Sequence, residues 1–453
     1  MFFTLFNPDK QCAHNRSGTI CGQCKVNYSL TLGDVQCSDC SKMNPAIAFG
    51  LLLLFALTGI ILVAFLILVK MTVASGMLNG LVFYANIVDA NRDIFVPQAG
   101  WMRVFISWLN LDFGFSTCFY SGMDMYGYTW LQFLFPFYIW MLIVILIVIS
   151  RRSAWVTKRV GSNPVAVLAT LILLSYAKLL RTVISVFYFA TLELPRGQTS
   201  TVWLYDGNVS YLRGKHLALF IFSLLFFVVL FLPYNFLLAV EPWLQYISAE
   251  RVNEPKPIAL VRKVLVGWYE DYRIKSFVDT YTVAYNPGYQ YWTGIFLMLR
   301  CVLFLVFATS AFKNSSATVM AVTTSLLAII SLARALSGRI YKSWGVDVLE
   351  NLFILNLGML SVATSHNMVT GGNQQLVADL SGGTFLILFL LIVAYHAWKQ
   401  VSSTNLYGVI YTKLKRKFPP EMDHDDQQTQ LLSNLIDNPQ EVTPMTVISV
   451  PST

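Results

Sequence analysis

The stretch AIAFGLLLLFALTGIILVAFLILV, residues 46–69, decides the fold class of this chain. It contains no charged side chain, and Lys70 follows it directly. A helix rises about 1.5 Å per residue and the hydrocarbon core of a bilayer is about 30 Å thick, so this run is long enough to cross a membrane. A helix on the surface of a soluble protein would carry a polar face, which this run lacks. The stretch therefore predicts a transmembrane helix.

The composition extends this prediction to the whole chain. Of 453 residues, 56% are hydrophobic and 12% are charged, whereas a soluble chain has about 25% charged residues. So little charge cannot cover the surface of two or three globular domains. The 32 Phe, 22 Tyr and 11 Trp residues exclude an intrinsically disordered chain. The main solvent of the protein is therefore lipid, and its net charge of +8 reports orientation rather than affinity for nucleic acid.

Further apolar stretches predict an all-α integral membrane protein, a bundle of about nine transmembrane helices with a small disulfide-rich extracellular head. The second stretch is short and rich in glycine, and it holds no charge before Asp89. The predicted domains are the head (1–44), the polytopic domain (45–400) and a largely disordered cytoplasmic tail (401–453). The nine spans are expected near residues 46–69, 73–88, 130–149, 165–191, 217–240, 292–312, 318–333, 348–365 and 383–398.

The basic residues predict the orientation of these spans. If the N-terminus is outside and nine spans alternate, 19 of the 32 Lys and Arg residues fall on inside stretches, 10 fall outside and three lie within spans. Cytoplasmic loops carry an excess of Lys and Arg, so this arrangement is the favoured one. It places the protein in the plasma membrane with the N-terminus extracellular and the C-terminus cytoplasmic.

Glycosylation sequons give a second, independent signal. Motifs of the form Asn-x-Ser/Thr occur four times, and all four fall on the outside in this topology. The predicted glycosylation sites are Asn15, Asn27, Asn208 and Asn314.

The first residues, 1–6, show no basic region and no cleavage site of a signal peptide. The first span is then expected to act as a reversed anchor. The alternative is that an upstream ectodomain carrying the signal is missing.

Five of the seven cysteines lie in the first 40 residues. Their spacing, Cys-x2-Cys-x12-Cys-x2-Cys from residue 21 to residue 40, also suits a zinc site. The predicted outside location favours disulfides, which form in oxidising compartments. An odd number leaves one thiol over, and Cys118 in the next outside loop could restore even pairing. We expect no metal and no cofactor, and the disulfide candidates are Cys12, Cys21, Cys24, Cys37, Cys40 and Cys118.

The head CAHNRSGTICGQCKVNYSLTLGDVQCSDC (12–40) resembles the Cys-rich, EGF-like module that precedes the membrane domain in large multi-pass proteins of sponges and other invertebrates. The resemblance covers nearly the whole chain, but that family brings no settled activity. The layout of a Cys-rich head followed by about nine spans is also similar to the TRP-like membrane proteins of fungi, which is a likeness of architecture. The strings that carry the first resemblance are GLVFYANIV (80–88), WLNLDFG (108–114), CFYSGMD (118–124), WLQFLFPFYIW (130–140), GSNPVAVLATLILLSYAKLLRT (161–182) and VWLYDG (202–207).

Four charged residues lie inside predicted spans: Lys178, Arg181, Arg300 and Glu350. A charge at the middle of a bilayer costs about 2.5–3.5 kcal/mol, so each should face protein, water or a partner. In one interpretation the cations snorkel or pair with Glu350, backbone carbonyls and hydroxyls, and hold the bundle together. In the other they line a cavity for an anion or a lipid head group. A voltage sensor is disfavoured because two basic residues carry little gating charge.

Other charged segments indicate partners. The inside stretch 256–273 predicts a helix lying on the inner leaflet, and basic residues at 413–417 suit the anionic lipids of that leaflet. Asp112 and Asp124, in an aromatic outer loop, could bind a cation or an extracellular partner, but such residues more often cap helices and form turns.

No enzyme signature is found, since the chain has neither a Gly-rich phosphate loop nor a nucleophile elbow. Three functions are considered in this order: a TRP-like channel or transport module, a receptor or sensor using the extracellular head, and a membrane anchor for a missing ectodomain. The oligomeric state is not predicted.

Overall fold

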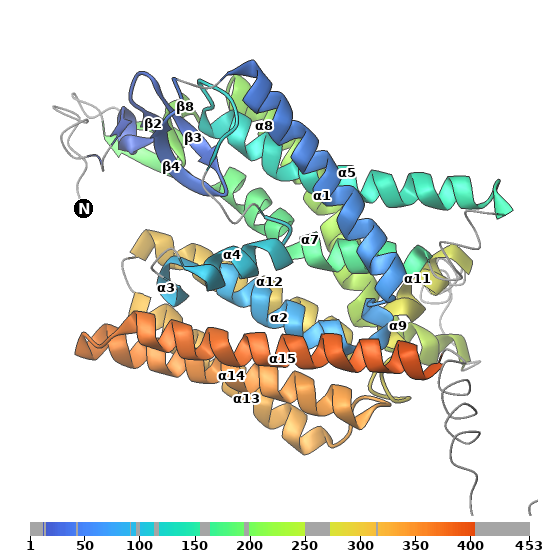
Figure 1. Ribbon diagram of the computed structural model, residues 1–453. Helices are drawn as coiled ribbons and strands as arrows, with labels where there is room; N and C mark the ends of the chain where they lie inside the picture. Colours follow the sequence, from blue (N-terminus) through green and yellow to red (C-terminus); the bar gives the residue numbers. More distant parts are fainter. Residues whose placement is uncertain are drawn as a thin grey trace, which may run out of the picture. The chain divides into compact units, whose positions relative to one another are not determined.

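The computed structural model describes residues 12, 15–41, 44–90, 92–96, 100–112, 117–154, 164–193, 199–249, 272–313 and 316–403. Residues 1–393 form one compact unit, whose helices are shown in Figure 1. A second unit begins at residue 394, and its described part is the end of the last helix.

Among the described residues, seven helical stretches are long and apolar enough to cross a membrane, so the chain is a multi-pass membrane protein. The prediction of a mainly helical membrane bundle with a small disulfide-bonded head is confirmed. The prediction of nine spans is not. The seven stretches are Ala46–Ser75, Met125–Ser150, Pro164–Phe187, Lys215–Val240, Thr318–Ser337, Trp344–Thr370 and Gln374–Trp398.

A π-helical stretch, η4 (Phe227–Phe231), connects α8 to α9 without a break. The main helices are α1 (Pro45–Val69), α2 (Met77–Ala90), α4 (Trp101–Leu109), α5 (Met125–Ser150), α7 (Pro164–Phe187), α8 (Lys215–Phe226), α9 (Leu232–Ala249), α11 (Tyr272–Thr282), α12 (Trp292–Lys313), α13 (Ser316–Ser337), α14 (Trp344–Thr370) and α15 (Gln374–Ser403).

Two of the nine predicted spans account for the difference. The second is divided into a 3-10 turn, η3 (Val73–Ser75), and the 14-residue helix α2, which begins after Gly76. Gly76 has a φ of 75°, which ends the turn in the left-handed region that glycine favours. At 1.5 Å per residue α2 is only about 21 Å long. In α12, the described apolar part is Trp292–Phe307, which is also shorter than a typical span.

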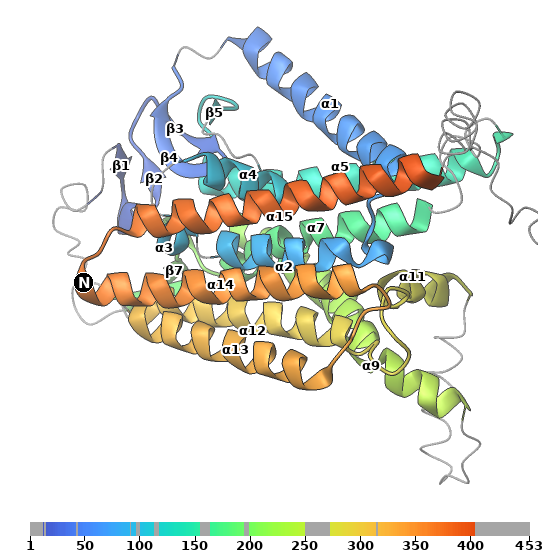
Figure 2. The ribbon, with the colours of Figure 1, turned by 60° about the horizontal axis from the view of Figure 1, so that its bottom comes forward.

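Helix α2 is the centre of the bundle. It contacts α4, α7, α12 and α14, and its Tyr84 ring stacks on Phe385 of α15 with the centroids 4.5 Å apart. Twelve of its fourteen residues are buried, because helices pack around it and its sequence MLNGLVFYANIVDA is mostly apolar. Figure 1 and Figure 2 both show α2 enclosed between the helices of the first and second halves of the chain.

Helix α1 has the opposite character. Its N-cap Asn44 accepts a hydrogen bond from Ala46 N at 3.1 Å, and Pro45 occupies the first turn, where its missing N–H costs nothing. Most of its large apolar side chains are exposed, as expected for a helix whose surface faces lipid. Its first turns stand away from the bundle, whereas its end lies against α5 (Figure 2).

The head is built from short strands held by disulfides. A three-stranded sheet has the order β4-β3-β5, and a hairpin from the loop after α7 forms a second sheet, β6-β7-β8. The β8 end of the hairpin packs on the head, since a Cβ on Gly22 would lie 2.7 Å from Asp206 Cα. We call this end of the bundle the head end, and the end with α11 the far end. The strands are β1 (Arg16–Ser17), β2 (Gln23–Cys24), β3 (Tyr28–Leu32), β4 (Asp34–Asp39), β5 (Thr117–Cys118), β6 (Phe189–Glu193), β7 (Thr199–Trp203) and β8 (Asp206–Ser210).

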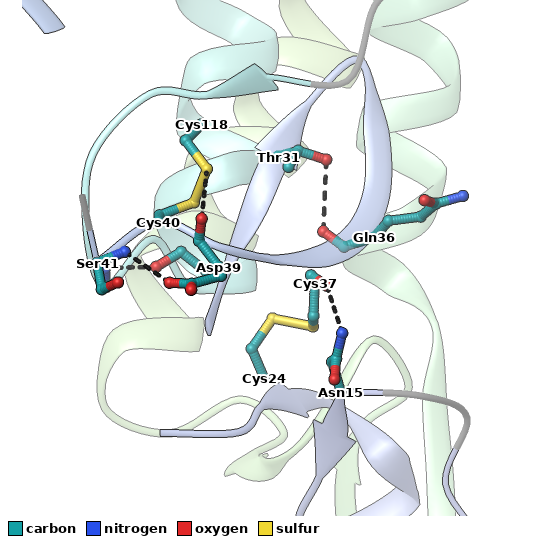
Figure 3. Close-up of a disulfide and its surroundings, with 11 residues drawn as sticks. Asn15, Cys24, Thr31, Gln36, Cys37, Asp39, Cys40, Ser41 and Cys118 are labelled. Carbon is teal, nitrogen blue, oxygen red and sulfur yellow. Dashed lines mark hydrogen bonds between the residues drawn. A yellow bond between two sulfur atoms is a disulfide. The ribbon is translucent and has the colours of Figure 1, made fainter. Parts of the chain in front are cut away.

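All six cysteines proposed as disulfide candidates form disulfides in the structure. The pairs are Cys12–Cys21, Cys24–Cys37 and Cys40–Cys118, and the second and third are drawn in Figure 3. The third joins the head to the loop before α5, so Cys118 restores even pairing. Cys301 is free and lies on α12.

Close packing of α12 on α9 gives a first prediction. A Cβ on Gly294 of α12 would lie 2.5 Å from Ala239 Cα of α9. Gly294→Ala should therefore push the two helices apart and lower the free energy of unfolding by about 1–3 kcal/mol, measured by thermal unfolding in detergent. Gly358→Ala on α14 is the matched control, because a Cβ there meets nothing within 4 Å and alanine favours a helix. Equal unfolding temperatures for the two variants would contradict this packing.

Candidate functional site

A group of charged side chains lies inside the head end of the bundle. It comprises Asp89 at the end of α2, Arg92 in the short helix α3 (Arg92–Phe95), Asp112 after α4, and Lys178 and Arg181 on α7. We call these five residues the head-end charge cluster. All are buried except Arg181, whose side chain is 38% exposed. Burial of so many ionisable groups in a membrane protein marks a candidate functional site.

Ion pairs connect the cluster. The Lys178 ammonium lies 3.4 Å from Asp112 Oδ1 and donates a hydrogen bond to the Leu111 carbonyl at 2.8 Å. Arg92 lies 3.8 Å from Asp112. Arg181 lies 3.8 Å from Asp89 Oδ2, and it also reaches the Asp89 carbonyl at 3.4 Å. A cation at this place suits the C-terminal end of α2, where the helix dipole is negative.

The cluster lines a small polar cavity of about 60 Å³. The wall is completed by hydroxyl and amide side chains, including Gln132 of α5, Thr182 and Ser185 of α7, and Tyr205 from the turn between β7 and β8. Thr182 and Ser185 follow Lys178 at four- and three-residue spacing, so they lie on the same face of α7. Burial raises the pKa of the Tyr205 hydroxyl above its ordinary value, so Tyr205 remains a hydrogen-bond donor at neutral pH.

Three cations and two carboxylates of this cluster line the cavity. One carboxylate oxygen, Asp89 Oδ1, is buried without a hydrogen-bond partner in the part of the chain that the structure describes. The cavity therefore has the groups to hold a small anion or water beside its cations.

A second group of polar side chains lies at the far end. Asn79 on α2 donates to the hydroxyls of Tyr285 and Tyr341 at 3.3 Å each. Tyr341 in turn hydrogen-bonds Glu350 of α14 at 2.8 Å, and Glu350 pairs with Arg334 of α13. We call these five residues the far-end polar cluster. It ties α2, α13 and α14 to the connections before α12 and α14, so both ends of α2 lie against buried polar groups.

Arg334 is the best-connected cation of the far end. Besides Glu350, it reaches Asp347 Oδ1 at 3.1 Å and Asn351 Oδ1 at 2.8 Å. Its guanidinium also lies over the ring of Trp292, 5.8 Å from the centroid. The N–H groups of the guanidinium thus have carboxylate and amide acceptors and its face lies over a ring, which is what allows it to be buried.

The structure brings together only part of the residues predicted to carry function. Lys178 and Arg181 share one cavity, as expected for neighbours on a helix face. Arg300 of α12 contacts α2 instead: it lies 3.5 Å from the Asn79 carbonyl and over the Phe83 ring. It forms no ion pair with Glu350 among the described residues. Of the partners that the first interpretation allowed, Lys178, Arg181 and Arg300 contact backbone carbonyls, whereas Glu350 pairs with Arg334.

The sequence did not identify Asp89, Arg92 or Arg334 as site residues. Asp112 was expected in an outer loop, as a possible ligand for a cation or a partner. Asp112 is recruited because the loop after α4 folds back against α7. One signal was available for Arg334: Asp347 and Glu350 are three residues apart and so share one face of a helix. Asp124 is a helix cap, as predicted, and accepts from Gly127 N at 2.8 Å.

The other predicted sites are distributed as follows. Asn15, Asn27 and Asn208 all lie at the head end, where Asn208 Oδ1 accepts from Thr19 N at 3.4 Å. Asn15 donates to the Cys37 carbonyl (Figure 3). Asn314, the predicted inner-leaflet helix before residue 272 and the C-terminal tail lie outside the described residues.

Comparison with known protein families, curated proteins and solved structures finds no match for this chain. What the structure itself establishes is a multi-pass membrane protein with a disulfide-bonded head and two buried polar clusters joined by one short central helix.

Proposed function

We propose that the chain is a transport module that binds an anionic group in the head-end cavity. The observation that carries this proposal is α2, a short buried helix that is separated from the turn η3 by Gly76 and has a polar cluster at each end. In many transporters, interrupted helices place polar groups and helix ends at the substrate site in the middle of the membrane. The resemblance in layout to the TRP-like membrane proteins also favours transport, but the proposal does not depend on it.

The arrangement suggests how an anion would be handled. Arg181, the most exposed member of the head-end charge cluster, is the first cation that a ligand arriving from the head side meets. Lys178 lies deeper and is held in place by the Leu111 carbonyl. An anion would compete with Asp112 for Lys178, so binding exchanges one ion pair for another and need not leave a buried charge uncompensated.

The far-end polar cluster serves in this proposal as the closed side of the pathway. The rings of Tyr285 and Tyr341 stack with centroids 4.5 Å apart, and their hydroxyl oxygens are hydrogen-bonded at 2.9 Å. Opening this side would require breaking the Tyr341–Glu350 hydrogen bond, which is a discrete two-state event of the kind that alternating access needs.

Flux measurements test the proposal. Purified protein in liposomes should release an anion such as chloride or phosphate faster than empty liposomes do. Lys178→Gln and Arg181→Gln should each slow this flux by about tenfold or more, because a hydrogen bond to a charged group contributes about 1.5–3 kcal/mol. Arg181→Gln is the safer variant, since its side chain is partly exposed.

Arg213→Gln is the matched control for these variants, because Arg213 is an exposed cation at the head end outside the cavity. It should leave the flux unchanged. Flux that is equally low in empty and protein-containing liposomes, for every anion tested, would remove the transport proposal.

A receptor or sensor is the second candidate. The observation that favours it is the covalent Cys40–Cys118 link, which joins the extracellular head of the predicted topology to the loop that leads into α5. A partner that pulled on the head would move this loop. A membrane anchor, the third possibility, predicts that Lys178→Leu and Arg181→Leu leave expression and surface display intact.

A further inference from the structure

A second cavity adjoins the head-end charge cluster and is apolar. It is a crevice of about 310 Å³ between α1, from Leu51 to Phe65, and the helices α4 and α5. Leu32 of β3 and Thr117 of β5 lie at its head-side edge. Leu54 on its α1 wall is 52% exposed, so the crevice communicates with the surface of α1 that faces lipid. We call it the α1 crevice; the divergence of α1 from α5 is visible in Figure 2.

The α1 crevice and the head-end cavity share a wall. Asp112 lines both of them. Phe135 of α5 lines the crevice, and the Lys178 ammonium, which lines the cavity, lies 5.7 Å from the centre of the Phe135 ring. The two cavities therefore meet at Asp112, where an apolar crevice open to lipid adjoins a polar cavity lined by three cations. Few ligands other than an amphiphile have groups for both.

We infer that this pair of cavities binds one anionic phospholipid of the head-side leaflet, with an acyl chain in the α1 crevice and the phosphate beside Lys178 and Arg181. The inference rests on the proposed function and names its substrate class. An engineered cavity of about 150 Å³ holds benzene. The 60 Å³ cavity is smaller than that and admits only a small polar group, whereas the 310 Å³ crevice is large enough for a stretch of hydrocarbon chain.

Charge selects the head group. The head-end charge cluster carries three cations, and Arg181, the most exposed of them, is available to a negatively charged head group. A phospholipid with a net charge of −1 supplies such a head group, and a zwitterionic phospholipid brings its own cation along with the phosphate. A free inorganic anion gains nothing from the apolar crevice, because its hydration shell has no replacement there. Phosphatidylglycerol is therefore preferred over phosphatidylcholine and over free phosphate.

Lipid-stripped protein in detergent provides the test. The midpoint of thermal unfolding is followed as a function of added dioleoyl phosphatidylglycerol, phosphatidylcholine with the same chains, or inorganic phosphate. The expected result is an apparent affinity about tenfold or more tighter for phosphatidylglycerol than for the other two. Arg181→Gln should remove the preference over phosphatidylcholine.

The chain site is tested with two neighbouring leucines of α1. Leu54 lines the crevice, whereas Leu53 has nearly the same exposure, 51% against 52%, and does not line it. Leu54→Trp should exclude about two methylene groups of the acyl chain from the crevice and so weaken phosphatidylglycerol binding by about tenfold. Leu53→Trp should leave the binding unchanged. Thr58→Trp, one turn further along the same wall, is a second variant if the first folds poorly.

The outcomes separate this inference from the proposed function. Equal protection by phosphatidylglycerol and phosphatidylcholine, or equal binding by the Leu53→Trp and Leu54→Trp variants, overturns the phospholipid site. Protection by inorganic phosphate alone, with anion flux in liposomes, overturns the site and leaves the transport proposal standing. Phospholipid binding as described, without movement of any anion or of fluorescent phosphatidylglycerol between leaflets, supports the site and removes the transport proposal.

Discussion

Glu350→Leu is expected to lower the free energy of unfolding by about 3–5 kcal/mol, the cost of removing one member of a buried ion pair. Glu350 is 2% exposed and pairs with the fully buried Arg334. It also accepts the Tyr341 hydrogen bond, so the substitution leaves two donors without their acceptor. Thermal and chemical unfolding of the purified protein in detergent measure the effect.

Two controls show whether charge burial is the cause. Asp347→Asn changes the other carboxylate partner of Arg334, which is 13% exposed, and should cost less because water screens it. The double variant Glu350→Leu with Arg334→Leu should recover part of the lost stability, since no charge of the pair then stays buried alone. If the effects of Glu350→Leu and Arg334→Leu on the free energy of unfolding simply add in the double variant, the two residues do not act as a pair.

The contribution of Tyr341 can be separated in the same way. Tyr341→Phe removes its hydrogen bonds to Glu350 and Tyr285 and keeps the ring over which Arg334 lies. It should therefore cost much less than Glu350→Leu, about 1–3 kcal/mol for the unpaired groups left behind.

The membrane class could be predicted from the sequence because it depends on local properties. A run such as 46–69 is apolar whatever surrounds it, and α1 follows that run closely. The same reasoning fails for the second predicted span. Its residues are apolar, but Gly76 starts a new helix, and the burial of α2 on all sides depends on helices far away in the sequence. Hydropathy does not distinguish a helix that is buried in protein from one that is buried in lipid.

Charge pairing was the least predictable property of the candidate site. Asp112 and Lys178 are 66 residues apart, and their contact depends on the loop after α4 folding back on α7. No spacing rule reports such a contact, whereas the neighbours Lys178 and Arg181 could be placed on one helix face. Likewise, the number of cysteines suggested that Cys118 belongs with the head, but its partner Cys40 is determined by the pairing of β3 with β5.

Removing the Cys40–Cys118 disulfide is expected to undock the head without unfolding it. The two cysteines are 78 residues apart in sequence, and the chain-entropy model assigns about 4.5 kcal/mol to closing a loop of that length. This is an upper value, because membrane-embedded helices already restrict the intervening chain. Cys24–Cys37 and Cys12–Cys21 remain and keep the head strands together.

Hydrogen exchange of the purified Cys40→Ser, Cys118→Ser variant measures the undocking. Besides the short pairing of β3 with β5, two hydrogen bonds continue to join the head to the loop before α5, Gly122 N to Ser29 Oγ at 2.7 Å and Leu30 N to Met123 O at 3.1 Å. Two such bonds contribute only about 1–3 kcal/mol together, which is less than the lost link, so β3 and the loop should exchange much faster.

The control removes a different disulfide of the same head. Cys12 and Cys21 are only nine residues apart, and the same model assigns about 2.7 kcal/mol to that shorter loop. The Cys12→Ser, Cys21→Ser variant should therefore loosen the residues around β1 and leave the exchange of β5 unchanged. Because Leu32 and Thr117 lie at the head-side edge of the α1 crevice, only the Cys40→Ser, Cys118→Ser variant should also weaken phosphatidylglycerol binding. Unchanged exchange at β5 in that variant would show that strand pairing alone holds the head, and the disulfide would then have no part in shaping the crevice.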